Sequence, residues 1–230
     1  MVIFVQWSEM KGTMMSRTAK AGKGTAALAR PGRRERRAAQ TRERIFRAAL
    51  RLFAERGFVA TTVKDITEAA DVGKGTFFNY FPSKEHAVAA FGEMQVSKVA
   101  AAVANPAARE RPLEATMRRM VQSLAEEPGR SPALMRAVLT AILTSAPVRH
   151  LMLRNLERAR MLLAEFFRAA QQRGELRRDR KPEEIARAMQ RMFFGTMFMW
   201  AVDPSGALKD RFEQSFTLFW TAVHTSGKRT

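Results

Sequence analysis

The sequence predicts an all-α protein with an N-terminal three-helix helix-turn-helix domain followed by a larger helical domain. Apolar residues recur at intervals of three and four over most of the chain after Thr41, which is the period of a helix. No segment of useful length alternates as a strand would, and Gly or Pro separates the periodic segments. Two of these segments are short and lie three residues apart, as in a helix-turn-helix.

The composition indicates a globular protein with a polyanionic partner. The chain has 230 residues, of which 46% are hydrophobic and 27% charged, an ordinary globular balance. Its net charge of +18 favours nucleic acid and, less often, an anionic membrane surface. The absence of cysteine excludes disulfides and thiolate-bound metals. The most apolar run, 192–202, is shorter than the roughly 20 residues that span a bilayer. We expect a cytoplasmic protein without a membrane partner.

The first forty residues differ from the rest. Residues 1–40 show no helical or strand period and carry nine basic residues against two acidic ones. This pattern predicts a flexible basic arm. Two interpretations remain open: a solvated tail without specific contacts, or an arm that lies along DNA phosphates or enters the minor groove.

The first predicted helix runs from Thr41 to Gly57. Apolar residues at helical spacing give it one buried stripe, formed by Ile45, Ala48, Ala49, Leu52 and Phe53. Gly57 is the residue type that most often ends a helix in a left-handed conformation. The helix should therefore pack one face against the two short helices that follow.

Those two short helices span 62–70 and 74–81. Thr62 and Asp65 have the spacing of a capping box, and Pro82 cannot continue the second of the two helices. Their inward side chains form a small core: Val63, Ile66, Ala70, Val72, Phe77 and Phe81. Such a core fixes the outer face of 74–81, and a helix of this size fits the major groove of DNA.

The remainder of the chain is predicted to be a succession of helices. Their expected spans are about 83–102, 112–126, 131–144, 147–172, 182–202 and 208–225. Pro182 suits the first turn of its helix, where a missing N–H costs nothing. No internal repeat and no heptad run is present.

Residues 41–88 resemble the N-terminal domain of the TetR/AcrR family of transcriptional regulators. The matching elements are Ala49-x-x-Leu52-Phe53, Gly57-Phe58, Thr61-Thr62-Val63-x-x-Ile66, Val72-x-Lys74-Gly75-Thr76 and Tyr80-Phe81-x-x-Lys84-Glu85. The resemblance implies a DNA-binding domain over 41–88 and an effector-binding and dimerisation domain over 89–226. It further implies a homodimer that binds double-stranded DNA at a palindromic operator and is usually a repressor released by a small-molecule effector.

The resemblance also implies which residues face DNA. They are Thr62, Lys74, Gly75, Thr76, Phe78, Asn79, Tyr80 and Lys84. Thr62 would hold a phosphate with its hydroxyl and N–H, and Tyr80 and Lys84 would bind further phosphates. Departures from the common pattern include Asp71 in place of a turn glycine and Gly73 in place of a capping serine, which weakens the N-cap. Phe78 stands where tyrosine is common, so that hydroxyl is lost.

Two apolar seams in the C-terminal half predict a dimer interface. Two such helices from each subunit would form a four-helix bundle. The alternative is that both seams face the protein's own core. The candidate interface residues are Met192, Thr196, Trp200, Phe212, Phe216, Phe219 and Val223.

Met and Phe are frequent in the middle of the larger domain. At helical spacing such residues are usually core, but this family commonly encloses an effector pocket in the same region. Flexible Met and aromatic side chains suit an apolar or amphipathic ligand. The candidate pocket residues are Met117, Met120, Met152, Phe166, Met189, Phe193 and Met197.

Catalysis has little support in the sequence. The histidines His86, His150 and His224 lie far apart, and no metal-binding or nucleophile motif is present. We therefore expect no enzyme activity, no metal and no cofactor. The function expected is that of a sequence-specific repressor released by an apolar or amphipathic ligand. The alternative is a nucleoid-type DNA-binding protein without an effector, which would bind with steep salt dependence and little sequence preference.

Overall fold

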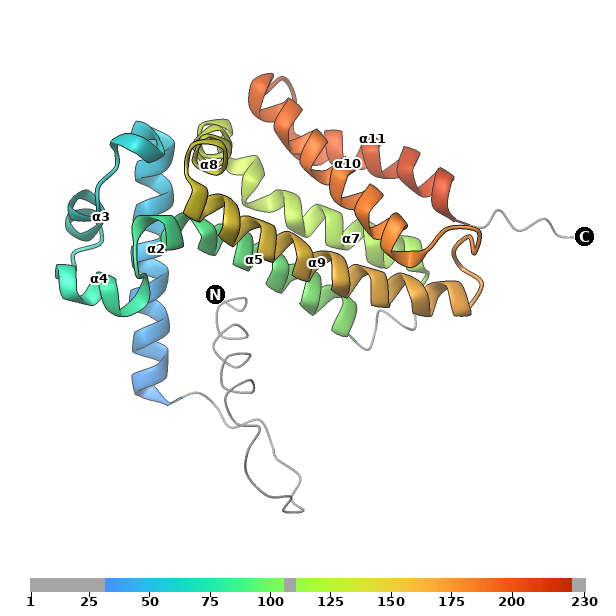
Figure 1. The fold of residues 1–230 in the computed structure, drawn as a ribbon, viewed down its shortest axis with the longest axis horizontal. Helices are drawn as coiled ribbons and strands as arrows, with labels where there is room; N and C mark the ends of the chain where they lie inside the picture. Colours follow the sequence, from blue (N-terminus) through green and yellow to red (C-terminus); the bar gives the residue numbers. More distant parts are fainter. Residues whose placement is uncertain (1–31, 106–110, 225–230) are drawn as a thin grey trace, which may run out of the picture.

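The computed structural model describes residues 32–105 and 111–224. Every element of secondary structure named in this part of the chain is a helix (Figure 1). The small N-terminal domain comprises α2 (Arg33–Ala60), α3 (Val63–Ala69) and α4 (Lys74–Tyr80). The larger domain comprises α5 (Lys84–Ala104), α7 (Leu113–Glu126), the 3-10 turn η1 (Pro128–Arg130), α8 (Pro132–Thr144), α9 (Ala146–Gln172), α10 (Pro182–Val202) and α11 (Leu208–Val223). The predicted all-α class is confirmed.

The first helix is longer than the sequence predicted. α2 begins at Arg33 rather than at Thr41, so residues 33–40 of the expected arm are helical. These turns are almost entirely polar and mostly exposed, and they therefore carry no apolar period. Glu35 strengthens the helix start, because its Oε2 accepts a hydrogen bond from the Gly32 N–H at 2.9 Å. The rest of the expected arm, 1–31, lies outside the described residues.

Two left-handed residues shape the small domain as expected. Gly57 has φ 80° and interrupts the helical backbone of α2 just before its last turn. Asp71, in the turn between α3 and α4, has φ 48°. Left-handed backbone favours glycine, and aspartate is among the few other residues that tolerate it. The turn therefore forms in spite of the unusual residue.

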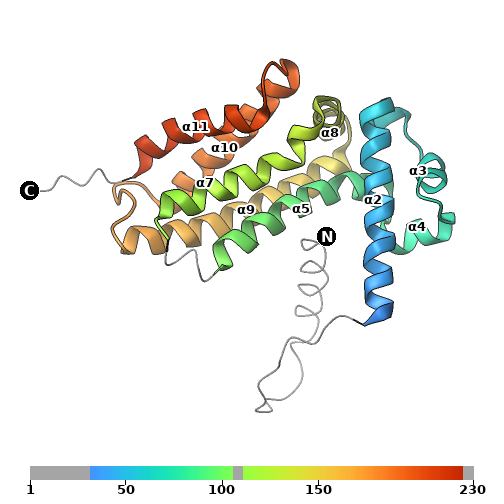
Figure 2. The same ribbon diagram turned by 180° about the vertical axis from the view of Figure 1, so that it is seen from behind.

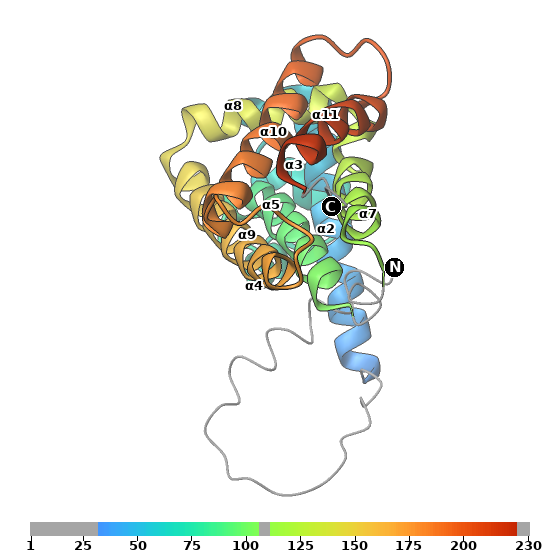
Figure 3. The same ribbon diagram turned by 90° about the vertical axis from the view of Figure 1, so that its right-hand side faces the viewer.

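The two domains meet where α2 packs against α8 and α5. In Figure 2, α3 and α4 lie on the side of α2 that faces away from the larger domain. Within the larger domain α9 packs along both α5 and α10, and α11 packs on α7 and α10. Figure 3 shows α10 and α11 together at one edge of the domain. This arrangement leaves the outer faces of α4 and of the α10–α11 pair open to partners.

The composition of α5 reflects its place in the core. Within the described ranges, α5 is the one helix long and apolar enough to cross a membrane, with 21 residues and a mean hydropathy of 1.2. Half of that segment is buried in the protein, where it contacts α9 and α7. The core helix of a helical domain needs the same composition, which accounts for its hydropathy.

Candidate nucleic-acid interface and enclosed cavity

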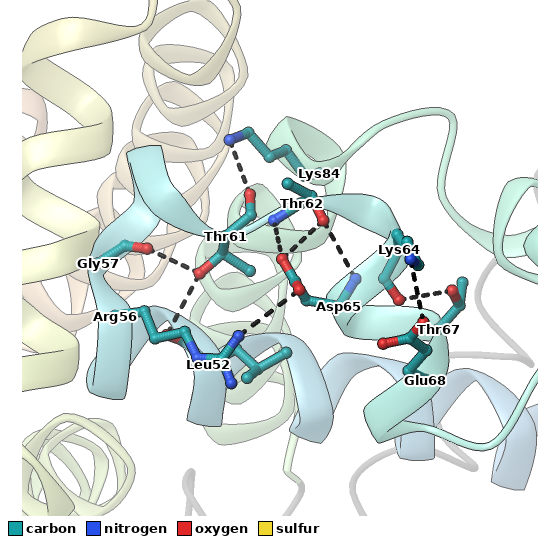
Figure 4. Close-up of polar contacts among 10 residues, drawn as sticks. All are labelled: Leu52, Arg56, Gly57, Thr61, Thr62, Lys64, Asp65, Thr67, Glu68 and Lys84. Carbon is teal, nitrogen blue, oxygen red and sulfur yellow. Dashed lines mark hydrogen bonds and ion pairs between the residues drawn. The ribbon is translucent and has the colours of Figure 1, made fainter.

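The start of α3 is fixed by a capping box between Thr62 and Asp65 (Figure 4). The Asp65 N–H donates to Thr62 Oγ1 at 3.2 Å, and Asp65 Oδ2 accepts from the Thr62 N–H at 2.8 Å and from its hydroxyl at 2.6 Å. The hydrogen bonds from Thr62 lower the pKa of Asp65. Both donors that were expected to hold a phosphate are therefore engaged by Asp65. A phosphate bound through them would have to displace this carboxylate.

Lys84 has a different environment from the one predicted. Its Nζ donates to the carbonyl oxygens of Phe58, Val59 and Thr61 at 3.0, 3.2 and 2.9 Å, respectively. The same Nζ lies 4.7 Å from the centroid of the Phe58 ring. An ammonium group has three N–H donors, and all three are used at the end of α2. Figure 4 shows the hydrogen bond to the Thr61 oxygen. Lys84 therefore caps the end of α2, and its Nζ would have to release one of these carbonyl groups to bind a phosphate.

The outer face of α4 is arranged as the sequence predicted. Phe77 and Phe81 are buried in the small core, at 0% and 2% exposure. Lys74, Gly75, Phe78 and Asn79 are exposed, and a Cβ at Gly75 would meet no atom within 4 Å. Thr76 and Tyr80 are half-buried at its margins. Gly73 provides no side-chain cap for α4, as expected from its replacement of serine.

The first turns of α2 add basic groups that sequence reasoning had placed in an arm. Arg33, Arg34 and Arg37 are exposed, and this end of α2 projects past α4 (Figures 1 and 2). A polar helix without an apolar stripe gives no periodic signal, so only its charge could have been noticed.

Arg42 joins the small domain to α5. Its guanidinium lies 3.6 Å from the Glu93 carboxylate and 4.9 Å from the centroid of the Phe81 ring. Burial lowers the pKa of Arg42, while Glu93 opposes that shift. This contact links the middle of α5 to the residue that ends α4.

The larger domain contains a partly open apolar cavity of about 80 Å³ between α5, α7, α8, α9 and α10. Five of the seven predicted pocket residues line it: Met120, Met152, Met189, Phe193 and Met197. Met117 and Phe166 are not among the lining residues; Met117 is buried in the core and Phe166 packs against it. From α5 the lining includes Phe91, Gly92, Gln95, Val96 and Val99, which sequence reasoning missed.

The predicted dimer seams are mostly buried inside the protein's own domain. Trp200, Phe212, Phe216 and Val223 are at most 8% exposed, and Phe212 stacks on Phe193 with ring centroids 4.5 Å apart. These four residues therefore belong to the core, which was the alternative left open. Met192, Thr196 and Phe219 remain partly exposed.

A different face of α10 and α11 is apolar and exposed. Phe198, Met199, Val202 and Leu218 are 47%, 56%, 64% and 75% exposed. Gly195 lies on the same side of α10, and a Cβ there would meet nothing within 4 Å. From Gln214 to the end of α11, the other exposed positions are also uncharged: Gln214, Thr217, Thr221 and Ala222. We call these exposed residues of α10 and α11 the uncharged face.

A helix-turn-helix domain packed on a larger helical domain that contains an apolar cavity defines a class of one-component DNA-binding regulators. The family model "Bacterial regulatory proteins, tetR family" matches residues 45–91. The chain is 32% identical to FadR of Thermus thermophilus, a TetR-family transcriptional repressor solved in complex with lauroyl-CoA. That match has a TM-score of 0.59 and covers 77% of this chain and 92% of FadR. The chain therefore belongs to the TetR family.

Curated relatives match over part of the chain. TcmR of Streptomyces glaucescens, an HTH-type transcriptional regulator, is 41% identical over 86 residues, which are 37% of this chain and 38% of TcmR. The repressor KstR of Rhodococcus jostii is 31% identical over 104 residues, 45% of this chain and 48% of KstR. The chain thus aligns with less than half the length of either relative.

Proposed function

We propose that this protein is a cytoplasmic homodimeric repressor that binds a palindromic operator through α4 and leaves it when a small apolar ligand enters the cavity. The exposed outer face of α4, with Lys74, Gly75, Phe78 and Asn79, has the size and chemistry for the major groove. The basic composition supplies phosphate affinity, and the names of its relatives support the role of repressor.

The observation that carries this proposal is the double role of α5. The helix starts at Lys84, directly after the turn that follows α4, and Phe91, Gln95 and Val99 form one wall of the cavity. Gly92 lets α5 approach α9 closely, since a Cβ there would lie 3.0 Å from Asn155 Nδ2. A ligand that separates α5 from α9 would move α4 as well. The ligand then favours the conformation in which the two α4 helices are wrongly spaced.

The uncharged face of α10 and α11 supports the homodimer. An exposed apolar face without charges on a protein of net charge +18 is well suited to a second copy of itself. A two-fold dimer also explains the operator symmetry, because each α4 reads one half-site and the half-sites lie about 34 Å or more apart.

The test is a DNase footprint with the full chain on DNA upstream of its own gene, followed by selection from a genomic library, at physiological salt. A protected near-palindrome supports the proposal and provides the probe for effector screening. If neither experiment finds a discrete binding site, the proposal is contradicted. Binding without a discrete site and with steep salt dependence would instead support the nucleoid-type alternative, which the high net charge favours.

A further inference from the structure

Gln95 of α5 holds a buried acceptor without a partner. Its Nε2 donates to the Leu124 carbonyl oxygen of α7 at 3.1 Å, while its Oε1 is buried and accepts no hydrogen bond. Three buried side-chain oxygens in the described part of the chain share this property, and Gln95 Oε1 is the one whose residue lines the cavity. A buried acceptor without a donor is unfavourable unless something else supplies the donor.

The orientation of this amide is fixed by its partner. A backbone carbonyl can only accept, so the nitrogen of Gln95 must face Leu124 and the oxygen must point away from it. This oxygen is covered by neighbouring side chains, so a ligand reaches it only when they move apart. The other two carboxamides of the lining are held in the same manner. Gln190 Nε2 donates to the Leu156 oxygen at 2.8 Å, and Asn155 Nδ2 to the Ala89 oxygen at 3.4 Å.

The rest of the lining limits the charge and the shape of an occupant. None of the described residues that line the cavity is ionisable. A carboxylate or an ammonium group there would lose its hydration without gaining a counter-ion. Pockets for small molecules are larger, at about 300–1,000 Å³, so side chains must move apart on binding. The flexible thioethers of Met120, Met152, Met189 and Met197 permit this.

We infer that the cavity selects an uncharged apolar ligand that carries a hydroxyl or N–H donor, and that Gln95 Oε1 accepts this hydrogen bond. The inference rests on the proposed ligand-responsive function and specifies the chemistry of its effector. It makes Gln95 a specificity residue on the helix that follows α4. An acyl ligand with a charged head group would have to keep that group outside this cavity.

The test uses three probes with one apolar body. 4-Butylphenol carries a donor, 4-butylanisole replaces the donor by a methyl ether, and 4-butylbenzoate is anionic. Calorimetric titration of the full chain, without DNA, should give a Kd for the phenol about tenfold lower than for the anisole, because a buried hydrogen bond is worth about that factor. The benzoate should bind more weakly than either.

Two variants locate the acceptor. In Gln95→Met, which keeps the length of the side chain, the phenol and the anisole should bind within about twofold of one another. In Gln190→Leu, the matched control on α10, the preference for the phenol should persist. If Gln95→Met does not fold, the comparison of phenol and anisole in the wild type still decides whether the cavity requires a donor.

Several outcomes would overturn the inference. These are equal affinities of phenol and anisole in the wild type, no binding of any probe, tighter binding of the benzoate, or a phenol preference that survives in Gln95→Met. The footprint separates this failure from a failure of the proposed function. A discrete operator without a phenol preference retains the repressor and rejects the role of Gln95. A phenol preference without an operator retains the cavity chemistry and rejects the repressor.

Discussion

Lys74 is the first residue of α4 and Lys84 is the first residue of α5, but the surroundings of the two side chains differ. Lys74 is exposed at the first position of α4, whereas Lys84 donates to three carbonyl groups at the end of α2. The same charge is therefore exposed at one position and engaged by carbonyl groups at the other. A phosphate contact is visible as a change in the salt dependence of DNA affinity, while a helix cap is visible in the melting curve.

We predict that Lys84→Met lowers the free energy of unfolding by about 1–3 kcal/mol, because three carbonyls lose a charged donor. Its slope of log K against log salt concentration should equal that of the wild type. Lys74→Met, the matched control, should reduce the magnitude of this slope by about 0.9 and leave stability unchanged. Denaturant titration and DNA binding at several salt concentrations measure both. A reduced slope for Lys84→Met would show that Lys84 also binds a phosphate.

Asp65 gives the small domain a pH dependence of known sign. Its hydrogen bonds with Thr62 lower the pKa below the ordinary value of 3.8, so the folded state favours the carboxylate. This contribution to stability is present above pH 3.8 and is lost as the pH falls through the lowered pKa. Asp65→Asn should therefore melt at a lower temperature than the wild type at pH 6, with a gap that narrows toward pH 3. A difference in melting temperature that does not change with pH would show that ionisation of Asp65 contributes nothing to stability.

At the scale of the elements, the N-terminal turns of α2 extend the basic surface beside α4. Replacing Arg33, Arg34 and Arg37 by Ala should weaken binding to all DNA sequences and reduce the salt dependence, without changing the order of preference among sequences. The matched control replaces the exposed Arg119, Arg154 and Arg158 of the larger domain, which removes the same net charge. Competition binding to operator and random DNA measures the effect. Equal losses in both variants would indicate a general charge effect.

The elements show where sequence reasoning succeeds and where it stops. Caps and turns are local, so Thr62 with Asp65, the break at Gly57 and the turn at Asp71 were all predicted from neighbouring residues. The exposed start of α2 was missed because a helix without a buried face has no apolar period. The cavity wall on α5 was missed because that helix is apolar on most of its surface, and no single stripe distinguishes the lining.

Partners far apart in the sequence account for the remaining errors. Periodicity correctly showed that Phe212, Phe216 and Val223 share a face, but it could not show that the protein's own core covers that face. The sequence shows that Lys84 carries a positive charge, but it does not show that the carbonyl groups of Phe58 and Thr61 lie next to it. In both cases the sequence defines a chemical group, and the tertiary structure determines which partner satisfies it.

At the scale of the whole molecule, the proposed function requires two-fold assembly, because a palindromic operator has two half-sites and each subunit has one α4. On the uncharged face of α10 and α11, Leu218 is 75% exposed and is accompanied by the exposed Phe198, Met199 and Val202. A group of exposed apolar side chains, unlike a single one, is typical of a protein–protein interface. A glutamate there would bring two carboxylates together in a desolvated interface, which is costly. Since Leu218 makes little contact within its own chain, the fold should be unaffected.

We therefore predict that Leu218→Glu is a folded monomer at concentrations where the wild type is a dimer. Because a monomer binds only one half-site, its affinity for the operator should fall by more than about tenfold. Leu143→Glu is the matched control, because Leu143 lies at the end of α8 with 74% exposure. It should remain dimeric and bind the operator normally. Sedimentation equilibrium and operator titration, with circular dichroism to verify folding, measure these properties. A dimeric Leu218→Glu, or a monomeric Leu143→Glu, would place the subunit interface on a different face and would separate the uncharged face from dimer formation.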